Sequence, residues 1–85
     1  MTSKAFAHFI NILKMNKKNI RGYSVNYDDN AIKAFDHLAY VLSIEETDSL
    51  FDSARLSSKI HFEDRLGRNF TLIYKNNGNF ELKKR

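Results

Sequence analysis

Three histidines are the first residues to examine as metal ligands or catalysts. His8, His37 and His61 fall in different parts of the chain, and none stands at a short regular spacing from another. Protein metal sites usually combine closely spaced His, Cys and carboxylate ligands, and this chain has no cysteine. Asp36 directly precedes His37, but adjacent residues on a helix do not face each other. We therefore expect no metal site and no cofactor.

One group of charged residues has the order of a nuclease motif. Asp64 followed by Glu81 and Lys83 matches the D…E-x-K pattern. The strand register derived below places Glu81 and Lys83 on one face of a sheet and Asp64 on the other, so the three would not converge. No nucleophile-elbow or phosphate-loop motif occurs in the chain. The sequence therefore predicts no catalytic residues and a protein that is not an enzyme.

The charged residues are sorted along the chain. Residues 1–22 carry five cations and no acid, residues 23–64 carry nine acids and three cations, and residues 65–85 carry six cations and one acid. This sorting indicates an acidic and a basic surface on one molecule. Because clustered cations suffice to bind phosphates, the basic ends are the predicted nucleic-acid-binding regions. The residues concerned are Lys14, Lys17, Lys18, Arg21, Arg65, Arg68, Lys83, Lys84 and Arg85.

The acidic middle of the chain offers an alternative surface. A basic protein partner would be attracted to a helix that carries several carboxylates. The acids concerned are Glu45, Glu46, Asp48 and Asp52. Both sets of charged residues could also be ordinary solvent-exposed residues without a binding role. The sequence leaves these alternatives open.

Helical periodicity occurs in three segments. Residues 3–18 place Phe6, Phe9, Ile10 and Leu13 on one stripe, which predicts a first helix. A second helix is predicted over about 30–42, with Asp28 or Asp29 as its cap. Ser43 and Glu46 fit the S-x-x-E capping box and predict a third helix from about Ile44 to Ser57.

The last third of the chain predicts a three-stranded meander whose register follows from loop parity. A two-residue Asn77-Gly78 turn would put the apolar sets of neighbouring strands on opposite faces, whereas three-residue loops bring them together. The loops Arg65-Leu66-Gly67 and Asn76-Asn77-Gly78 then place Gly at the left-handed third position of a type I turn with a G1 bulge. The predicted pairs are Phe62 with Phe70, Ile60 with Leu72, Leu72 with Leu82 and Tyr74 with Phe80.

The opposite face of this sheet is predicted to be polar, mildly basic and free of aromatic residues. It carries Lys59, His61, Glu63, Thr71, Ile73, Lys75, Glu81, Lys83 and Arg85. Without aromatic residues, a platform that stacks the bases of a single strand is not expected. A further short strand is predicted over residues 23–27, where Tyr23, Val25 and Tyr27 alternate with polar residues.

Together these elements predict one compact α+β domain over residues 1–85, with three helices packed on a small antiparallel sheet. The order of elements is winged-helix-like, but a third helix rich in acids would repel DNA phosphates in the usual docking geometry. No apolar run is long enough to span a membrane. The absence of cysteine suits a reducing compartment, so we expect a cytoplasmic protein that does not contact membranes.

From Tyr23 onward the predicted order of strand, two helices and three strands resembles that of RelE/ParE-type toxins. Tyr23-Ser24-Val25-Asn26-Tyr27, followed by Ala31, Lys33 and Leu38, is similar to the opening of that family, and the segment from Gly67 to Lys75 is similar to its central hairpin. The resemblance implies a ribonuclease. Thr71 stands where the family usually has Arg, and no catalytic Arg/Tyr set follows.

The sequence thus predicts a small non-enzymatic binding protein of regulatory or accessory type. Its expected partner is nucleic acid or a nucleoprotein complex, bound through the basic regions. The alternative is an inhibitor or adaptor of the mobile-element type that binds a protein through the acidic third helix. A toxin of the RelE/ParE type is the third possibility.

Overall fold

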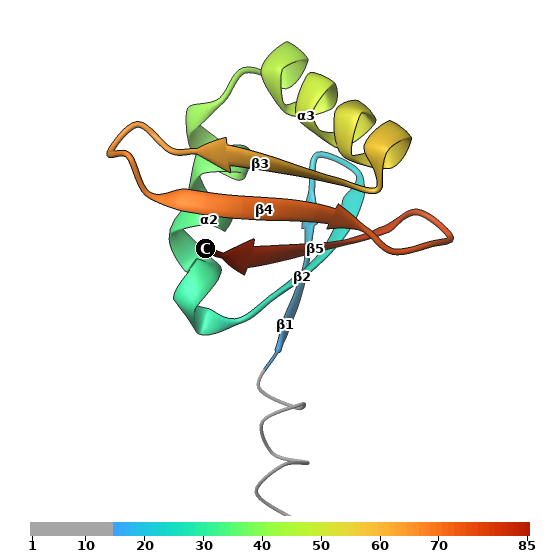
Figure 1. The fold of residues 1–85 in the computed structure, drawn as a ribbon, viewed down its shortest axis with the longest axis horizontal. Helices are drawn as coiled ribbons and strands as arrows, with labels where there is room; N and C mark the ends of the chain where they lie inside the picture. Colours follow the sequence, from blue (N-terminus) through green and yellow to red (C-terminus); the bar gives the residue numbers. More distant parts are fainter. Residues whose placement is uncertain (1–14) are drawn as a thin grey trace, which may run out of the picture.

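The computed structural model describes residues 15–85, which form one sheet and a helical layer (Figure 1). The strands are β1 (Asn16–Ile20), β2 (Tyr23–Tyr27), β3 (Lys59–Glu63), β4 (Asn69–Tyr74) and β5 (Asn79–Lys84). The helical elements are η1 (Asp29–Ala31), α2 (Ile32–Asp36), η2 (His37–Val41) and α3 (Ile44–Ser57). The predicted helix over 3–18 lies mostly outside the described residues, as do His8 and Lys14.

The sheet has five strands in the order β1-β2-β5-β4-β3. β2 runs parallel to β5, and every other neighbouring pair is antiparallel. A parallel pair requires a crossover connection, and here the chain passes through the whole helical layer, β3 and β4 before it returns beside β2. β2 and β5 therefore join the N-terminal hairpin to the C-terminal meander in one continuous sheet.

The predicted register of the meander is confirmed. Ile60 pairs with Leu72 and Phe62 with Phe70, while Leu72 pairs with Leu82 and Tyr74 with Phe80. The pairings leave three residues in each loop, as loop parity required. All seven side chains consequently point to the same face of the sheet.

The two loops of the meander differ in backbone conformation. Gly67 has φ +80° and is the only left-handed residue of its loop, as a type I turn with a G1 bulge requires. In the second loop Gly78 has φ +81°, but Asn77 is also left-handed, with φ +53°. The second loop therefore has the predicted length and a different turn, which Asn tolerates better than most residues.

Helix α3 has the predicted bounds and the predicted cap. The backbone N–H of Glu46 donates to Ser43 Oγ (3.1 Å), and the N–H of Ser43 donates to Glu46 Oε1 (2.8 Å). The predicted second helix is a helical segment in three parts, η1, α2 and η2, and the last of these has π-type hydrogen bonding. Asp28 occupies its N-cap position without a side-chain hydrogen bond.

The helical layer covers one face of the sheet and encloses the core. α3 packs against β3 and β4, and η1 and α2 pack against β5; Figure 1 shows α3 beside β3 and α2 behind the strands. Most apolar residues on this face of β2, β4 and β5 are buried beneath the helices, and Tyr23 and Tyr74 are half-buried. The core residues of the strands include Ile20, Val25, Tyr27, Phe70, Leu72, Phe80 and Leu82.

The α+β class is right, but the predicted arrangement of three helices on a three-stranded meander is wrong. The described residues hold a five-stranded mixed sheet and two helical segments. Residues 16–18 had been assigned to the end of the predicted helix over 3–18, but Asn16–Ile20 forms β1 and pairs with β2 through the two-residue turn Arg21-Gly22. Both turn residues are left-handed, with φ +48° and +97°, as a type I′ hairpin turn requires.

The winged-helix-like order of elements is also overturned by the sheet. In this chain β2 is an inner strand between β1 and β5, and α3 packs flat against β3 and β4. The buried residues of α3 are Thr47, Phe51 and Ala54. A helix held in this way has one face in the core, so its exposed acids belong to the surface of a two-layer fold.

Candidate functional site

The face of the sheet opposite the helices is the main candidate surface. Side chains of neighbouring strand residues alternate between the two faces, so the confirmed register defines this set. We call it the open face. It carries five cations and two acids: Lys17, Lys59, Lys75, Lys83, Arg85, Glu63 and Glu81.

The cations of the open face are spread over the width of the sheet. Lys17 lies on β1 and Lys59 on β3, the two outer strands of the described sheet. Four interstrand spacings separate these strands, a width of about 19 Å. A nucleic-acid strand crossing such a surface would meet a cation at several successive phosphates.

A row of polar side chains crosses the middle of the open face. His61, Thr71 and Lys83 are direct cross-strand neighbours on β3, β4 and β5. Thr71 is only 6% exposed, and its hydroxyl lies 2.8 Å from His61 Nδ1 in a hydrogen bond. This bond holds the imidazole against the sheet, two strands away from Lys83, so the row combines hydrogen-bonding groups with a positive charge.

Glu81 is the one acid near the centre of this surface. Its carboxylate lies 3.6 Å from Lys75 Nζ, and its side chain is mostly covered. Glu63 lies at the end of β3, next to Asn69. The remaining cations therefore outnumber free carboxylates, and the open face is basic.

The helical layer itself, residues 28–58, has the opposite charge. Residues 28–58 carry seven acids and two cations. Because these residues form the layer that covers the other face of the sheet, the two charges are separated by the thickness of the domain. The acids of the helical layer thus face away from the open face, although Lys18, Lys84 and Arg65 add positive charge on the helical side of the sheet.

The structure divides the predicted nucleic-acid-binding residues into groups. Lys17, Lys83 and Arg85 lie together on the open face with Lys59 and Lys75, which the prediction did not include. Lys18 and Lys84 are exposed at positions that point toward the helical side of β1 and β5. Strand alternation was available from the sequence for β5, where it separates Lys83 and Arg85 from Lys84, whereas the stretch that holds Lys17 and Lys18 had been predicted as helix.

Two of the predicted arginines have partners within the domain. Arg21 Nη2 donates to the carbonyl oxygens of Ala39 (3.4 Å) and Leu42 (3.3 Å), where cations stabilise the end of a helical segment. Arg68 forms an ion pair with the buried carboxylate of Asp64. Arg65 is exposed in the β3–β4 loop, on the helical side.

Asp64 organises the β3–β4 loop and takes no part in a nuclease-type site. Its Oδ1 accepts hydrogen bonds from the N–H groups of Leu66 and Arg68, both 2.9 Å. Burial alone would raise the pKa of Asp64, but these bonds and the Arg68 side chain hold it below its ordinary value. Glu81 and Lys83 lie on the other face of the sheet, as the register predicted.

A small hollow of about 270 Å³ lies beside this loop, between η2 and the arginines. His37 lines it and is 7% exposed. Burial lowers the pKa of His37, with a smaller opposing effect from Asp64. Within residues 15–85 no three His, Asp or Glu side chains gather closely enough to hold a metal ion.

Most of the acids predicted to bind a protein partner also have internal roles. Glu46 completes the capping box, and Asp48 Oδ1 accepts a hydrogen bond from the Tyr23 hydroxyl (2.8 Å). Asp52 lies 3.7 Å from the guanidinium group of Arg55. Glu45 has no hydrogen bond or ion pair among the described residues and is exposed to solvent.

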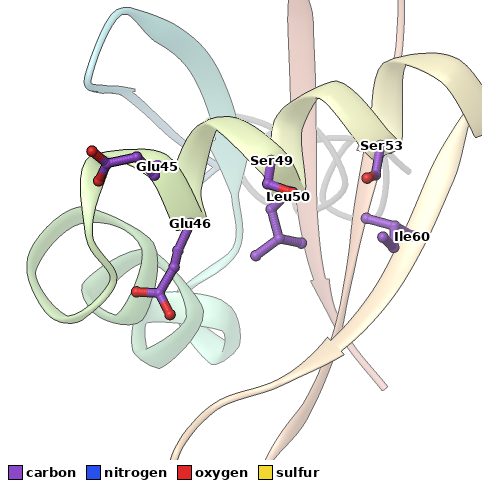
Figure 2. Close-up of a pocket in the computed structure, with 6 residues that line it drawn as sticks. All are labelled: Glu45, Glu46, Ser49, Leu50, Ser53 and Ile60. Carbon is purple, nitrogen blue, oxygen red and sulfur yellow. The ribbon is translucent and has the colours of Figure 1, made fainter.

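A groove of about 380 Å³ runs between α3 and β3 (Figure 2). Figure 2 shows Leu50 and Ser53 on the side of α3 that faces β3, with Ile60 on the strand below them. Leu50 and Ile60 are half-buried and form its apolar part, and Glu46 lies one helical turn before Leu50. The groove is thus apolar in its middle and acidic at one end.

Comparisons of the chain with protein-family models, with curated proteins and with solved structures gave no match. The resemblance to RelE/ParE-type toxins gains no support from them and stays a hypothesis. No helix within residues 15–85 is long and apolar enough to cross a membrane.

Proposed function

We propose that this protein is a non-enzymatic binding protein of regulatory or accessory type that holds nucleic acid or a nucleoprotein complex on the open face of its sheet. The observation that carries the proposal is the contrast in charge between the open face and the helical layer, residues 28–58. Five cations lie on the open face, while the helical layer carries seven acids against two cations. A polyanion is attracted to the cations of the open face and repelled by the acids of the helical layer.

The expected binding mode is contact with phosphates. Among the described strand residues no Phe or Tyr lies on the open face, which leaves bases without a stacking surface. Within residues 15–85 the longest helix is α3, and the acids on its exposed side would repel the phosphates that flank a major groove. Binding is therefore expected to have little sequence preference and a steep dependence on salt.

Adjacent lysines on β1 and β5 offer a sharp test. The double variant Lys17→Ala/Lys83→Ala removes two cations from the open face, whereas Lys18→Ala/Lys84→Ala removes their sequence neighbours on the helical side. The first variant is expected to flatten the slope of log K against log salt by roughly 1 for each lost phosphate contact. The second should change the slope much less.

Fluorescence anisotropy with labelled duplex DNA and duplex RNA at several salt concentrations measures both slopes. Equal effects of the two double variants would refute the open face as the binding surface. No measurable binding at low salt would refute the nucleic-acid proposal as a whole.

A second candidate function is that of a protein inhibitor or adaptor of mobile-element type. The groove between α3 and β3 favours it, because this groove combines exposed acid with a half-buried apolar patch. Replacing Glu45 and Glu46 should then abolish association with a basic protein and leave nucleic-acid binding intact or strengthened.

The hypothesis of a RelE/ParE-type toxin predicts ribonuclease activity. Purified protein would have to cleave RNA and lose that activity when one open-face residue, such as His61 or Glu81, is replaced.

We propose that the protein acts in the cytoplasm, because a chain without cysteine suits a reducing compartment.

A further inference from the structure

Strand β3 lies at one edge of the described sheet, and its register shows which backbone groups are unpaired. The N–H of Tyr74 donates to the carbonyl of Ser58 (2.8 Å), and the N–H of Asp64 donates to the carbonyl of Arg68 (3.0 Å). In an antiparallel pair every second residue exchanges hydrogen bonds with its partner strand. Since Ser58 bonds to β4 and Asp64 bonds to the residue just before β4, the residues Ile60 and Phe62 between them bond to β4 as well.

The intervening residues of β3 direct their backbone groups away from the sheet. These residues are Lys59, His61 and Glu63, and no backbone or side-chain partner for their N–H and C=O groups occurs within the part of the chain that the structure describes. Three alternate residues with unpaired N–H and C=O groups at a strand edge form a template for another strand. The charged side chains on these residues discourage indiscriminate pairing.

The groove beside this edge selects among possible strands. An added strand would direct every second side chain under α3, into the space lined by Leu50, Ser53 and Ile60. Side chains on one face of a strand repeat every 6.6–6.8 Å or so, close to the rise of about 6 Å between Leu50 and Glu46 on α3. The residue two positions from an apolar residue at Leu50 would therefore lie toward the Glu46 end of the groove.

We propose that β3 and α3 together bind an extended segment of a partner protein as an additional antiparallel or parallel strand. The segment carries an apolar residue that fills the groove against Leu50 and Ile60, and a Lys or Arg two positions away that pairs with Glu46. Main-chain hydrogen bonds to Lys59, His61 and Glu63 supply affinity, and the groove supplies specificity. This surface is separate from the open face, and the inference does not depend on nucleic-acid binding.

Charge decides against the two other possible occupants. Pairing of β3 with β3 of a second copy would bring two acidic α3 helices side by side, and like charges there are unfavourable. Nucleic acid would bring phosphates to Glu45 and Glu46, which repel them. A basic, partly apolar peptide complements both the carboxylates and the apolar patch.

The probe for this site is the acetylated, amidated peptide TKTITKT, whose inward-facing residues are Lys, Ile and Lys in either strand direction. Its matched control is TETITET, which has the same shape and the opposite charge. We expect the first peptide to bind in fluorescence anisotropy and the control to bind at least about tenfold more weakly. N-methylation of alternate peptide bonds on the edge-facing side should abolish binding, because it removes the main-chain donors.

Amide exchange read by NMR localises the contact. The N–H groups of Lys59, His61 and Glu63 should become protected by the peptide, while those of Ile60 and Phe62 are already protected by β4. Protection elsewhere, or none at these three positions, would overturn the proposal.

Protein variants separate charge from structure. Glu46→Gln removes the carboxylate charge but retains the capping box, which Gln also forms. This variant should weaken the peptide by about tenfold, whereas Asp28→Asn, which removes the same charge from an exposed site without a side-chain cap bond, should not. Equal effects of the two changes would refute the site.

Lys17→Ala/Lys83→Ala should leave peptide binding unchanged. The peptide site and the nucleic-acid surface are thus tested by different variants, and either proposal can fail without the other.

Discussion

At the scale of single residues, Leu72 and Thr71 are neighbours in β4 with opposite environments. Leu72 is completely buried beneath the helices, whereas Thr71 is covered on the open face and bonded to His61. Leu72→Ala is expected to reduce the free energy of unfolding by about 2–5 kcal/mol, because it leaves a cavity in the core. Thr71→Ala should cost only about 1 kcal/mol, the value of one hydrogen bond. Urea unfolding of both variants measures the difference, and equal losses would refute the sheet register.

The pH dependence of stability is set in part by His37. Burial lowers its pKa from the ordinary value of 6.5, so the unfolded chain takes up a proton that the folded protein resists. The contribution of His37 to the free energy of unfolding should therefore be fully present above pH 6.5. It should decrease as the pH falls from 6.5 to the lowered pKa of the folded state. His37→Gln should flatten this decline in urea unfolding at a series of pH values.

Asp64 acts in a more acidic range with the same sign. Its pKa is held below the ordinary value of 3.8, so its contribution is present above that value and is lost as the pH falls through the folded-state pKa. Asp64→Asn should lower stability at neutral pH and flatten the acid decline. An unchanged acid profile for both variants would contradict these assignments.

At the scale of elements, the two helix starts differ in what their capping residues do. Ser43 and Glu46 exchange hydrogen bonds at the start of α3, whereas Asp28 makes no side-chain bond at the start of η1. Ser43→Ala is therefore expected to cost about 1 kcal/mol, and Asp28→Ala close to nothing. Thermal unfolding of the two variants tests this, and a larger loss for Asp28→Ala would show that the caps have been assigned the wrong way round.

At the scale of the whole molecule, the parallel pair β2–β5 is the contact that unites the sheet. Asn26 and Glu81 are direct neighbours across this pair on the open face. Because the chain has no native cysteine, Asn26→Cys/Glu81→Cys introduces the only two thiols, at a Cα separation suited to a disulfide. The variant should oxidise to an intramolecular disulfide, which mass spectrometry and thiol titration detect.

The control for this crosslink is Asn26→Cys/Ile73→Cys. Asn26 and Ile73 lie on β2 and β4, separated by β5, at about 10 Å, which exceeds the reach of a disulfide. Ready oxidation of the control, or failure of the Asn26–Glu81 pair, would contradict the strand order.

The sequence by itself determined the features that depend on local pattern. The capping box at Ser43 fixed the start of α3, and the parity of the loops after Asp64 and Lys75 fixed the register of the meander. These signals involve residues a few positions apart, so hydrogen bonding and strand alternation decide them with little help from the rest of the chain.

Only the tertiary structure decided how the N-terminal part joins the sheet. β1 has a single deeply buried residue, Ile20, and its lysines are typical of an edge strand, so no alternation of apolar residues identified it. The pairing of β2 with β5 joins residues from opposite ends of the described chain, and local patterns carry no information about such a distant partner. That pairing places Lys17 on the same surface as Lys83, so cations from both ends of the described chain meet on the open face.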